Sequence, residues 1–156
     1  MAKELDEGDP APHFTLPTDG GARADLADFA GKPVVLYFYP KDDTSGCTAE
    51  AIAFSGLKPE FDAAGAAVIG VSPDSAASHD KFKAKHALSV ALAADPERSA
   101  IEAYGVWKEK SMYGRKYFGV ERSTFLIGRD GRIAKIWRKV KVPKHAEDVL
   151  KAVRAL

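Results

Sequence analysis

The chain contains one cysteine, Cys47, and this residue is the side chain best suited to covalent chemistry. A thiolate is a strong nucleophile that is readily oxidised, whereas a buried thiol in apolar surroundings is inert. A single cysteine excludes an intramolecular disulfide, a four-cysteine zinc site and a cysteine-ligated iron–sulfur cluster. It leaves an inert core thiol, a reactive thiol, or a bond to another molecule.

The residues before Cys47 favour the reactive thiol. The run 34–39 is continuously β-branched and aromatic and stops at Pro40, which predicts a strand covered on both faces. A polar stretch, 41–46, follows, and apolar residues at helical spacing begin near Cys47. The thiol is therefore predicted at a helix N-terminus, where free amides and the helix dipole stabilise an anion.

The helix terminus alone is too weak to ionise the thiol. An ordinary thiol, with a pKa near 8.5, needs about 3.4 kcal/mol to reach a pKa of about 6. A helix terminus contributes only ~0.3–1 kcal/mol. A cation is therefore expected nearby. We expect Asp42 and Asp43 to face solvent or cap the turn, because carboxylates directed at the thiol would oppose its ionisation.

Hydrophobic periodicity predicts alternating strands and helices over most of the chain. The expected elements are a strand at 34–39, a helix from about 47 to 65 that kinks or breaks at Pro59, a strand at 67–72, a helix at 75–86, a strand at 90–93 and a short helix ending at 104. Asp-Gly at 130–131 between strands 124–127 and 133–137 predicts a hairpin, and a closing helix follows Pro143. This order predicts an α/β fold, a thioredoxin-like three-layer sandwich whose mixed central sheet is flanked by helices.

Composition predicts one globular domain spanning 1–156. With 23 basic and 22 acidic residues, the formal net charge of +1 provides no global field for nucleic acid or acidic membranes. The basic residues around 108–116 and 138–144 are interpreted as solvated faces, with a partner or nucleic-acid surface as the alternative. Residues 1–10 lack the apolar core of a signal peptide, and no stretch approaches the roughly 18 apolar residues of a membrane span. These observations predict a cytoplasmic protein that binds neither nucleic acid nor membrane.

Pro40, Thr44 and Cys47 match the Pro-x-x-x-Thr/Ser-x-x-Cys motif of peroxiredoxins. Their context, 37–44, resembles the Q-type subfamily, the bacterioferritin comigratory protein group. Further segments resemble that subfamily in order: Ala11-Pro12, 14–17, 104–107, 112–114, 122–127, and 140–142 with His145. The resemblance therefore extends over nearly the whole chain.

The resemblance implies roles for six residues. Cys47 would be the peroxidatic cysteine, which attacks a peroxide oxygen and becomes a sulfenic acid. Thr44 would hydrogen-bond the thiolate and the peroxide, and Arg122 would lower the thiol pKa and stabilise charge on the separating oxygens. The expected substrate pocket contains Pro40, Gly46 and Glu50. Of these, Pro40 would exclude water, and Glu50 is either an orienting partner for Arg122 or a solvated helix glutamate.

The sequence departs from the subfamily at Ile52, where many members carry a resolving cysteine. The chain thus resembles a one-cysteine variant whose sulfenic acid is reduced by an external thiol such as thioredoxin, glutaredoxin with glutathione, or a small thiol. Ser45 replaces the usual proline and should make the loop somewhat more flexible. A monomer or weak homodimer is expected. No cofactor is expected, and the four scattered histidines predict no metal site.

The leading hypothesis is a thiol-dependent peroxidase that reduces hydrogen peroxide and organic hydroperoxides. The alternatives are a redox-sensing or relay module that signals through a mixed disulfide at Cys47, and a structural protein with an inert thiol. Trp107, Met112, Tyr113 and Tyr117 could line an approach to the thiol, but core packing is the favoured interpretation.

Overall fold

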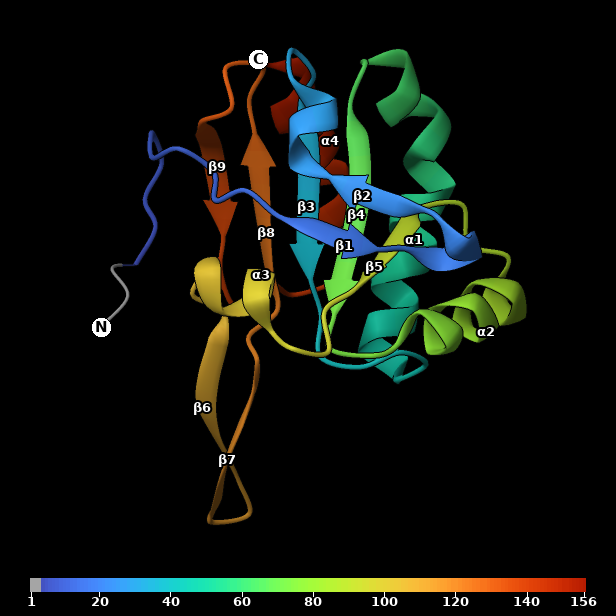
Figure 1. Cartoon of the computed structure of the whole chain (residues 1–156), viewed down its shortest axis with the longest axis vertical. Helices are drawn as coiled ribbons and strands as arrows, with labels where there is room; N and C mark the ends of the chain where they lie inside the picture. Colours follow the sequence, from blue (N-terminus) through green and yellow to red (C-terminus); the bar gives the residue numbers. More distant parts are fainter. Residues whose placement is uncertain (1–3) are drawn as a thin grey trace.

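The computed structural model describes residues 4–156. Residues 1–3, part of the stretch expected to lack a signal peptide, lie outside the described residues. Five strands form the central sheet in the order β5-β4-β3-β8-β9 (Figure 1). They are β3 (Val34–Phe38), β4 (Ala67–Ser72), β5 (Ala91–Ala94), β8 (Ser123–Ile127) and β9 (Ile133–Trp137). The first three run parallel, and β8 and β9 are antiparallel to their neighbours, so the predicted mixed sheet and the Asp-Gly hairpin are confirmed.

The central strand β3 is buried along its whole length because β4 and β8 flank it and layers cover both of its faces. This placement explains the uninterrupted apolar run in the sequence. The strand ends just before Pro40, and the chain then turns at the carboxyl edge of the sheet. Such edges, where strands end and helices begin, are where α/β folds collect their binding and catalytic groups.

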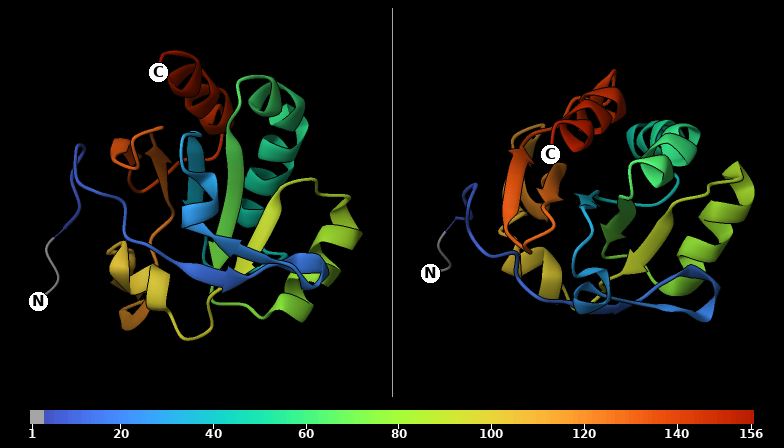
Figure 2. Two further views of the ribbon diagram at one scale, coloured as in Figure 1. Left: turned by 45° about the horizontal axis from the view of Figure 1, so that its top comes forward. Right: turned by 90° about the horizontal axis from the view of Figure 1, so that it is seen from above.

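Two layers enclose the sheet (Figure 2). One face is covered by α1 (Ser45–Ala63), α2 (Ala76–His86) and α4 (His145–Arg154). The other is covered by α3 (Ser99–Ala103) and by a small hairpin of β1 (Thr15–Pro17) and β2 (Arg23–Asp25). Each face has its own cluster of buried side chains, which confirms the three-layer sandwich. No helix within residues 4–156 is long and apolar enough to cross a membrane.

Helix α1 continues through Pro59, so of the predicted kink or break the break is wrong. Proline has no N–H to donate to the carbonyl four residues earlier, which belongs to Ser55. That carbonyl instead accepts a hydrogen bond from Ser89 Oγ at 3.2 Å, and Ser55 Oγ accepts from the Ser89 amide at 3.0 Å. A tertiary contact therefore replaces the missing helical hydrogen bond.

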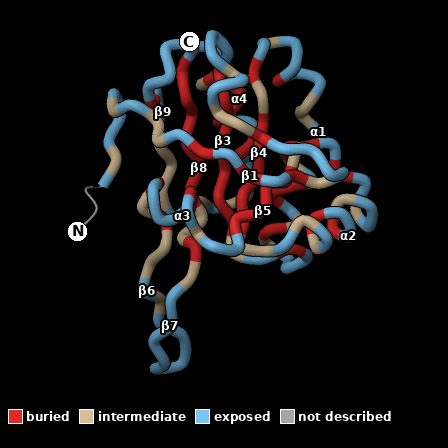
Figure 3. Tube along the Cα trace, in the orientation of Figure 1, coloured by how far each residue is buried: buried red, intermediate tan, exposed pale blue. Residues whose placement is uncertain are grey.

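A second hairpin, formed by β6 (Trp107–Met112) and β7 (Arg115–Val120), projects beyond the end of the central sheet (Figures 1 and 3). Its turn places Tyr113 and Gly114 at positive φ, at 52° and 76°. Met112, Tyr113 and Tyr117 are exposed, so the core-packing interpretation is wrong for these three. It is confirmed for Trp107, which packs against the cluster on the α3 face.

Candidate active site

Cys47 is the third residue of α1 and lies just beyond the carboxyl end of β3, as predicted. The helix cap, Thr44, has extended backbone angles, and its carbonyl accepts the first helical bond, from Thr48. The cysteine is 1% exposed. The thiol therefore lies in the first turn of α1 and is shielded from bulk water, a setting in which the positive end of the helix dipole acts more strongly on a thiolate.

The cation expected near the thiol is Arg122, which lies between β7 and β8. Its Nη2 donates to Cys47 Sγ at 3.3 Å, and its Nη1 donates to Glu50 Oε1 at 2.7 Å. Gly46 leaves room for this guanidinium, since a Cβ at that position would lie 3.1 Å from Arg122 Nη2. One side chain therefore bridges the sulfur and a carboxylate on the same helix.

Glu50 is 1% exposed, so its interpretation as a solvated helix glutamate is wrong. Burial raises its pKa to about 7, although the charge and hydrogen bond of Arg122 act in the opposite direction. Its Oε2 is buried and has no hydrogen-bond partner among the described residues. Burial lowers the pKa of Arg122, but Glu50 and Cys47 outweigh that effect and the net shift is upward. The guanidinium therefore remains cationic beside the thiol.

Thr44 and Pro40 flank this cluster. Thr44 is exposed, and its hydroxyl donates to the carbonyl of Lys41 at 2.9 Å. Within residues 4–156 no hydrogen bond joins that hydroxyl to Cys47, but its oxygen retains lone pairs that can accept a bond from an incoming O–H. Pro40 is half-buried at the end of β3. The structure thus joins Cys47 directly to Arg122, and places Thr44 and Pro40 on the loop that precedes the thiol.

The loop between β3 and α1 is held by a buried ion pair that sequence reasoning missed. Asp42 is buried, so the expectation that it faces solvent is wrong. Its Oδ2 lies 2.7 Å from His79 Nδ1, and its Oδ1 accepts from the Tyr39 hydroxyl at 2.6 Å. His79 Nε2 lies 2.9 Å from the carbonyl of Ala93. The carboxylate and the carbonyl can both accept, so the two ring nitrogens of His79 bridge the active-site loop and β5.

Burial raises the pKa of Asp42, but hydrogen bonds from His79, Tyr39 and Ser78 outweigh it and hold the pKa below its usual value. The active-site loop is thereby tied to α2 and β5. Asp43, in contrast, is exposed and pairs with Lys85 and His86, as expected for a solvated position.

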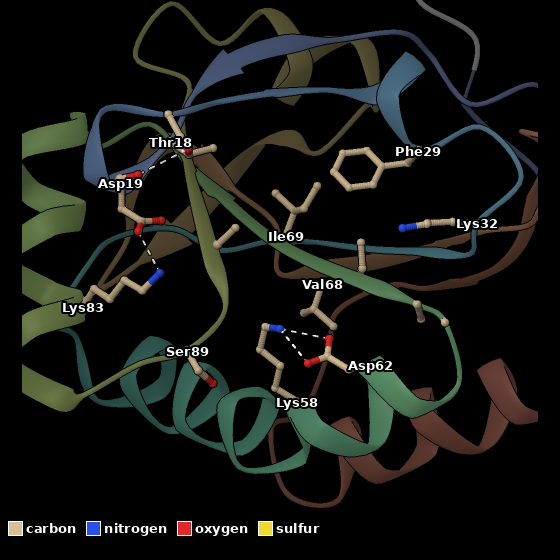
Figure 4. A pocket seen from close by; sticks show the side chains of 15 residues that line it. Thr18, Asp19, Phe29, Lys32, Lys58, Asp62, Val68, Ile69, Lys83 and Ser89 are labelled. Atoms are coloured by element: carbon tan, nitrogen blue, oxygen red, sulfur yellow. Dashed lines mark hydrogen bonds and ion pairs between the residues drawn. The ribbon is translucent and has the colours of Figure 1, made fainter.

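A cavity of about 460 Å³ lies at the amino ends of β4 and β5, at the opposite edge of the sheet from Cys47 (Figure 4). Two ion pairs, Lys58–Asp62 and Lys83–Asp19, occupy its wall. Two of its lysines, Lys58 and Lys83, are therefore neutralised, and the cavity is remote from the thiol. In the described part of the chain, no group of three or more His, Cys, Asp or Glu side chains is arranged to hold a metal ion.

Residues 7–136 match the model of the AhpC/TSA family. "Peroxiredoxin Bcp" of Xanthomonas campestris pv. campestris is 49% identical over 148 residues, which cover 94% of this chain and 92% of that protein. "Peroxiredoxin Bcp" of Bacillus subtilis is 47% identical, and the match covers 96% of each chain.

Solved structures give the same result. Peroxiredoxin Q of Xanthomonas campestris superposes with a TM-score of 0.87 at 48% identity, covering 91% of this chain and 90% of that one. A cysteine-to-serine mutant of Xylella fastidiosa PrxQ superposes with a TM-score of 0.93 at 42% identity, covering 99% and 98%. A further structure is that of the Xanthomonas campestris bacterioferritin comigratory protein, described in connection with its alkyl peroxide reduction activity. It superposes with a TM-score of 0.87 at 47% identity and covers 91% of this chain and 90% of that one. The resemblance inferred from sequence motifs is confirmed.

Proposed function

The chain belongs to the AhpC/TSA family and is a thiol-dependent peroxidase, and we propose that Cys47 is the residue that peroxide oxidises. The observation that carries this assignment is the contact of 3.3 Å between Arg122 Nη2 and Cys47 Sγ at the start of α1. An inert core thiol would have apolar neighbours instead of a guanidinium. The family membership likewise favours a peroxidase over a redox-sensing or relay module.

In the proposed reaction the thiolate attacks one oxygen of a hydroperoxide. An S–O bond forms, the O–O bond breaks, and the leaving oxygen departs as hydroxide or alkoxide, which takes a proton from solvent. Sulfur loses two electrons and becomes a sulfenic acid, while the peroxide is reduced to water or an alcohol. Negative charge moves from sulfur to the leaving oxygen, so the guanidinium of Arg122 lowers the barrier where it also donates to the separating oxygens.

The surrounding residues position that cation and admit the substrate. Glu50 holds Arg122 by the contact of 2.7 Å at Nη1, which leaves Nη2 directed at the sulfur. Gly46 leaves the guanidinium the space that a larger residue would fill. Thr44 would accept a hydrogen bond from the peroxide O–H, and Pro40 would limit the access of water.

The catalytic cycle requires an external thiol because Cys47 is the only cysteine in the chain. A first thiol condenses with the sulfenic acid to give a mixed disulfide and water, and a second thiol releases Cys47 in its reduced form. Thioredoxin, glutaredoxin with glutathione, and small thiols are the candidate reductants. A cytoplasmic location would keep these thiols reduced. We also propose that 1–156 is one domain, since one sheet carries both buried clusters. The oligomeric state proposed for it is a monomer or a weak homodimer.

The test is peroxide consumption measured in parallel with thioredoxin, with glutaredoxin plus glutathione, and with dithiothreitol. We expect sustained turnover in the wild type and none in Cys47→Ser. Without reductant, one equivalent of peroxide should give one sulfenic acid per chain, detected by mass spectrometry after trapping with dimedone. Retained turnover in Cys47→Ser would refute the assignment, whereas oxidation without turnover by any thiol would favour a sensor.

A further inference from the structure

The β6–β7 hairpin concentrates exposed apolar and basic side chains that the proposed reaction does not use. It carries four basic residues and one acidic residue, whereas the whole chain has a net charge of only +1. The remainder of the chain is therefore net acidic. Figure 3 shows that most of this basic hairpin is exposed or only partly buried.

The strand register divides these side chains between two faces. Residues paired across an antiparallel ribbon share a face, and alternate residues along each strand point to opposite faces. One face carries Trp107 stacked on Phe118, with ring centroids 6.5 Å apart, and the Glu109–Lys116 ion pair at 3.8 Å. That face therefore pairs its charges and its two aromatic rings internally, although Phe118 remains 60% exposed.

The second face, called the basic face below, has a different character. Its members are Lys108, Lys110, Met112, Arg115, Tyr117 and Gly119. It contains no acidic residue, and none of its three cations forms an ion pair within the described residues. Met112 is 56% exposed and Tyr117 is 42% exposed. Arginine, methionine and tyrosine are enriched in protein–protein contact surfaces, and the two lysines add positive charge that can attract an acidic partner.

The basic face leads to the thiol. Strand β7 ends at Val120, two residues before Arg122, whose Nη2 contacts Cys47 Sγ. Gly119 gives space to the stem of Lys110, since a Cβ at that position would lie 3.6 Å from Lys110 Cδ. Burial and the charge of Arg122 lower the pKa of Lys110, while Cys47 and Glu121 act in the opposite direction, so Lys110 lies within the field of the active site.

We propose that the basic face of the β6–β7 hairpin is the docking surface for an acidic protein thiol that reduces oxidised Cys47. This inference rests on the proposed function, because a chain with one cysteine needs a thiol from another molecule in each cycle. A protein suits the surface better than a small thiol. Positions 108 to 112 span roughly 13 Å along an extended strand, farther than one small thiol can reach while it attacks sulfur.

Charge complementarity also argues against a second copy of this chain as the occupant. Two basic faces would repel each other if they met in a symmetric dimer. An acidic protein would be steered to the hairpin by its cations and would then find Arg122 and Cys47 at the base of the same surface.

The experiment compares Lys108→Glu/Arg115→Glu with the control Lys116→Glu, which changes a charge on the opposite face of the same hairpin. Circular dichroism and thermal melting establish that each variant is folded. Steady-state kcat/KM is measured with reduced acidic thioredoxin and with uncharged dithiothreitol, at low and high salt. Stopped-flow oxidation of Cys47 by hydrogen peroxide, without any reductant, is recorded separately.

We expect the ratio of thioredoxin to dithiothreitol kcat/KM to fall about tenfold or more in the double variant, together with a weaker salt dependence. The control should retain the wild-type ratio. An unchanged ratio in the double variant, or an equal fall with both reductants, would overturn the docking proposal. If the wild type is a dimer, the double variant is a monomer and the kcat/KM ratio is unchanged, the basic face would instead be an interface with a second copy of this chain. Failure of peroxide to oxidise wild-type Cys47 would count against the proposed function rather than against the docking surface.

Discussion

The buried carboxyl group of Glu50 predicts that folding stability depends on pH in a specific direction. Glu50→Gln preserves the shape of the side chain and removes its charge. The Gln carbonyl can still accept from Arg122 Nη1, which lies 2.7 Å from Glu50 Oε1. At low pH, where Glu50 is protonated and neutral, the two proteins should therefore have similar free energies of unfolding.

At higher pH the free energies of unfolding of the wild type and of Glu50→Gln should diverge. Burial raises the pKa of Glu50 to about 7 from an ordinary value of 4.5, so between these values the folded chain binds more protons than the unfolded chain. Stability contributed by this group is therefore lost as pH rises through this window and stays lost above it. A shift of that size corresponds to about 3 kcal/mol. Glu50→Gln has no carboxyl group to ionise, so its free energy of unfolding should exceed that of the wild type by on the order of 3 kcal/mol at pH 8.

The assay is urea denaturation of wild type and Glu50→Gln from pH 4 to pH 8. Both are prepared in a Cys47→Ser background, so that the thiol does not titrate. The matched control is Glu60→Gln, an exposed glutamate on the same helix, whose difference from wild type should not change with pH. A Glu50→Gln difference that stays flat within about 0.5 kcal/mol, or that falls as pH rises, would refute the argument from burial.

Three further predictions concern the contacts around the thiol. Arg122→Met removes the charge-assisted hydrogen bond to Cys47 Sγ, which contributes ~1.5–3 kcal/mol, so stopped-flow oxidation by peroxide should slow by about 10- to 100-fold. A rate within twofold of wild type would contradict the role of Arg122. Gly46→Ala would place a Cβ 3.1 Å from Arg122 Nη2, so the same oxidation should slow while thermal melting shows unchanged or higher stability. Equal oxidation rates would show that the guanidinium moves aside freely. His79→Ala leaves Asp42 as a buried unpaired charge and should lower the free energy of unfolding by about 3–5 kcal/mol in urea titration. A loss below about 1 kcal/mol would show that Asp42 is not held as a buried ion.

Sequence reasoning identified the strand, the turn and the helix that present Cys47, because each has a local signal. A continuous apolar run marks β3, Pro40 ends it, and the apolar spacing after residue 47 marks α1. The break expected at Pro59 did not occur, because Ser89 supplies a hydrogen bond from a loop distant in sequence. Local propensity contains no information about such a donor.

The environment of charged side chains was the main failure of sequence reasoning. Asp42 and Asp43 are adjacent and chemically alike, yet one is buried against His79 and the other is exposed to solvent. The exposed hairpin was missed for a related reason. Its Tyr113-Gly114 turn was available as a signal, but apolar residues there were assigned to a core that does not reach them.

The sequence by itself determined that this chain has one thiol, that the thiol begins a helix after a buried strand, and that any disulfide must involve another molecule. The family resemblance indicated Arg122 as the cation, but only the tertiary structure shows that it contacts the sulfur, because Arg122 is 75 residues away and reaches Cys47 through the pairing of β8 with β3. The tertiary structure also decided that Glu50 is buried and that the basic face of the hairpin is open. Nucleophile identity is a property of one residue, whereas a guanidinium contact, a shifted pKa and an exposed surface depend on how distant segments are packed.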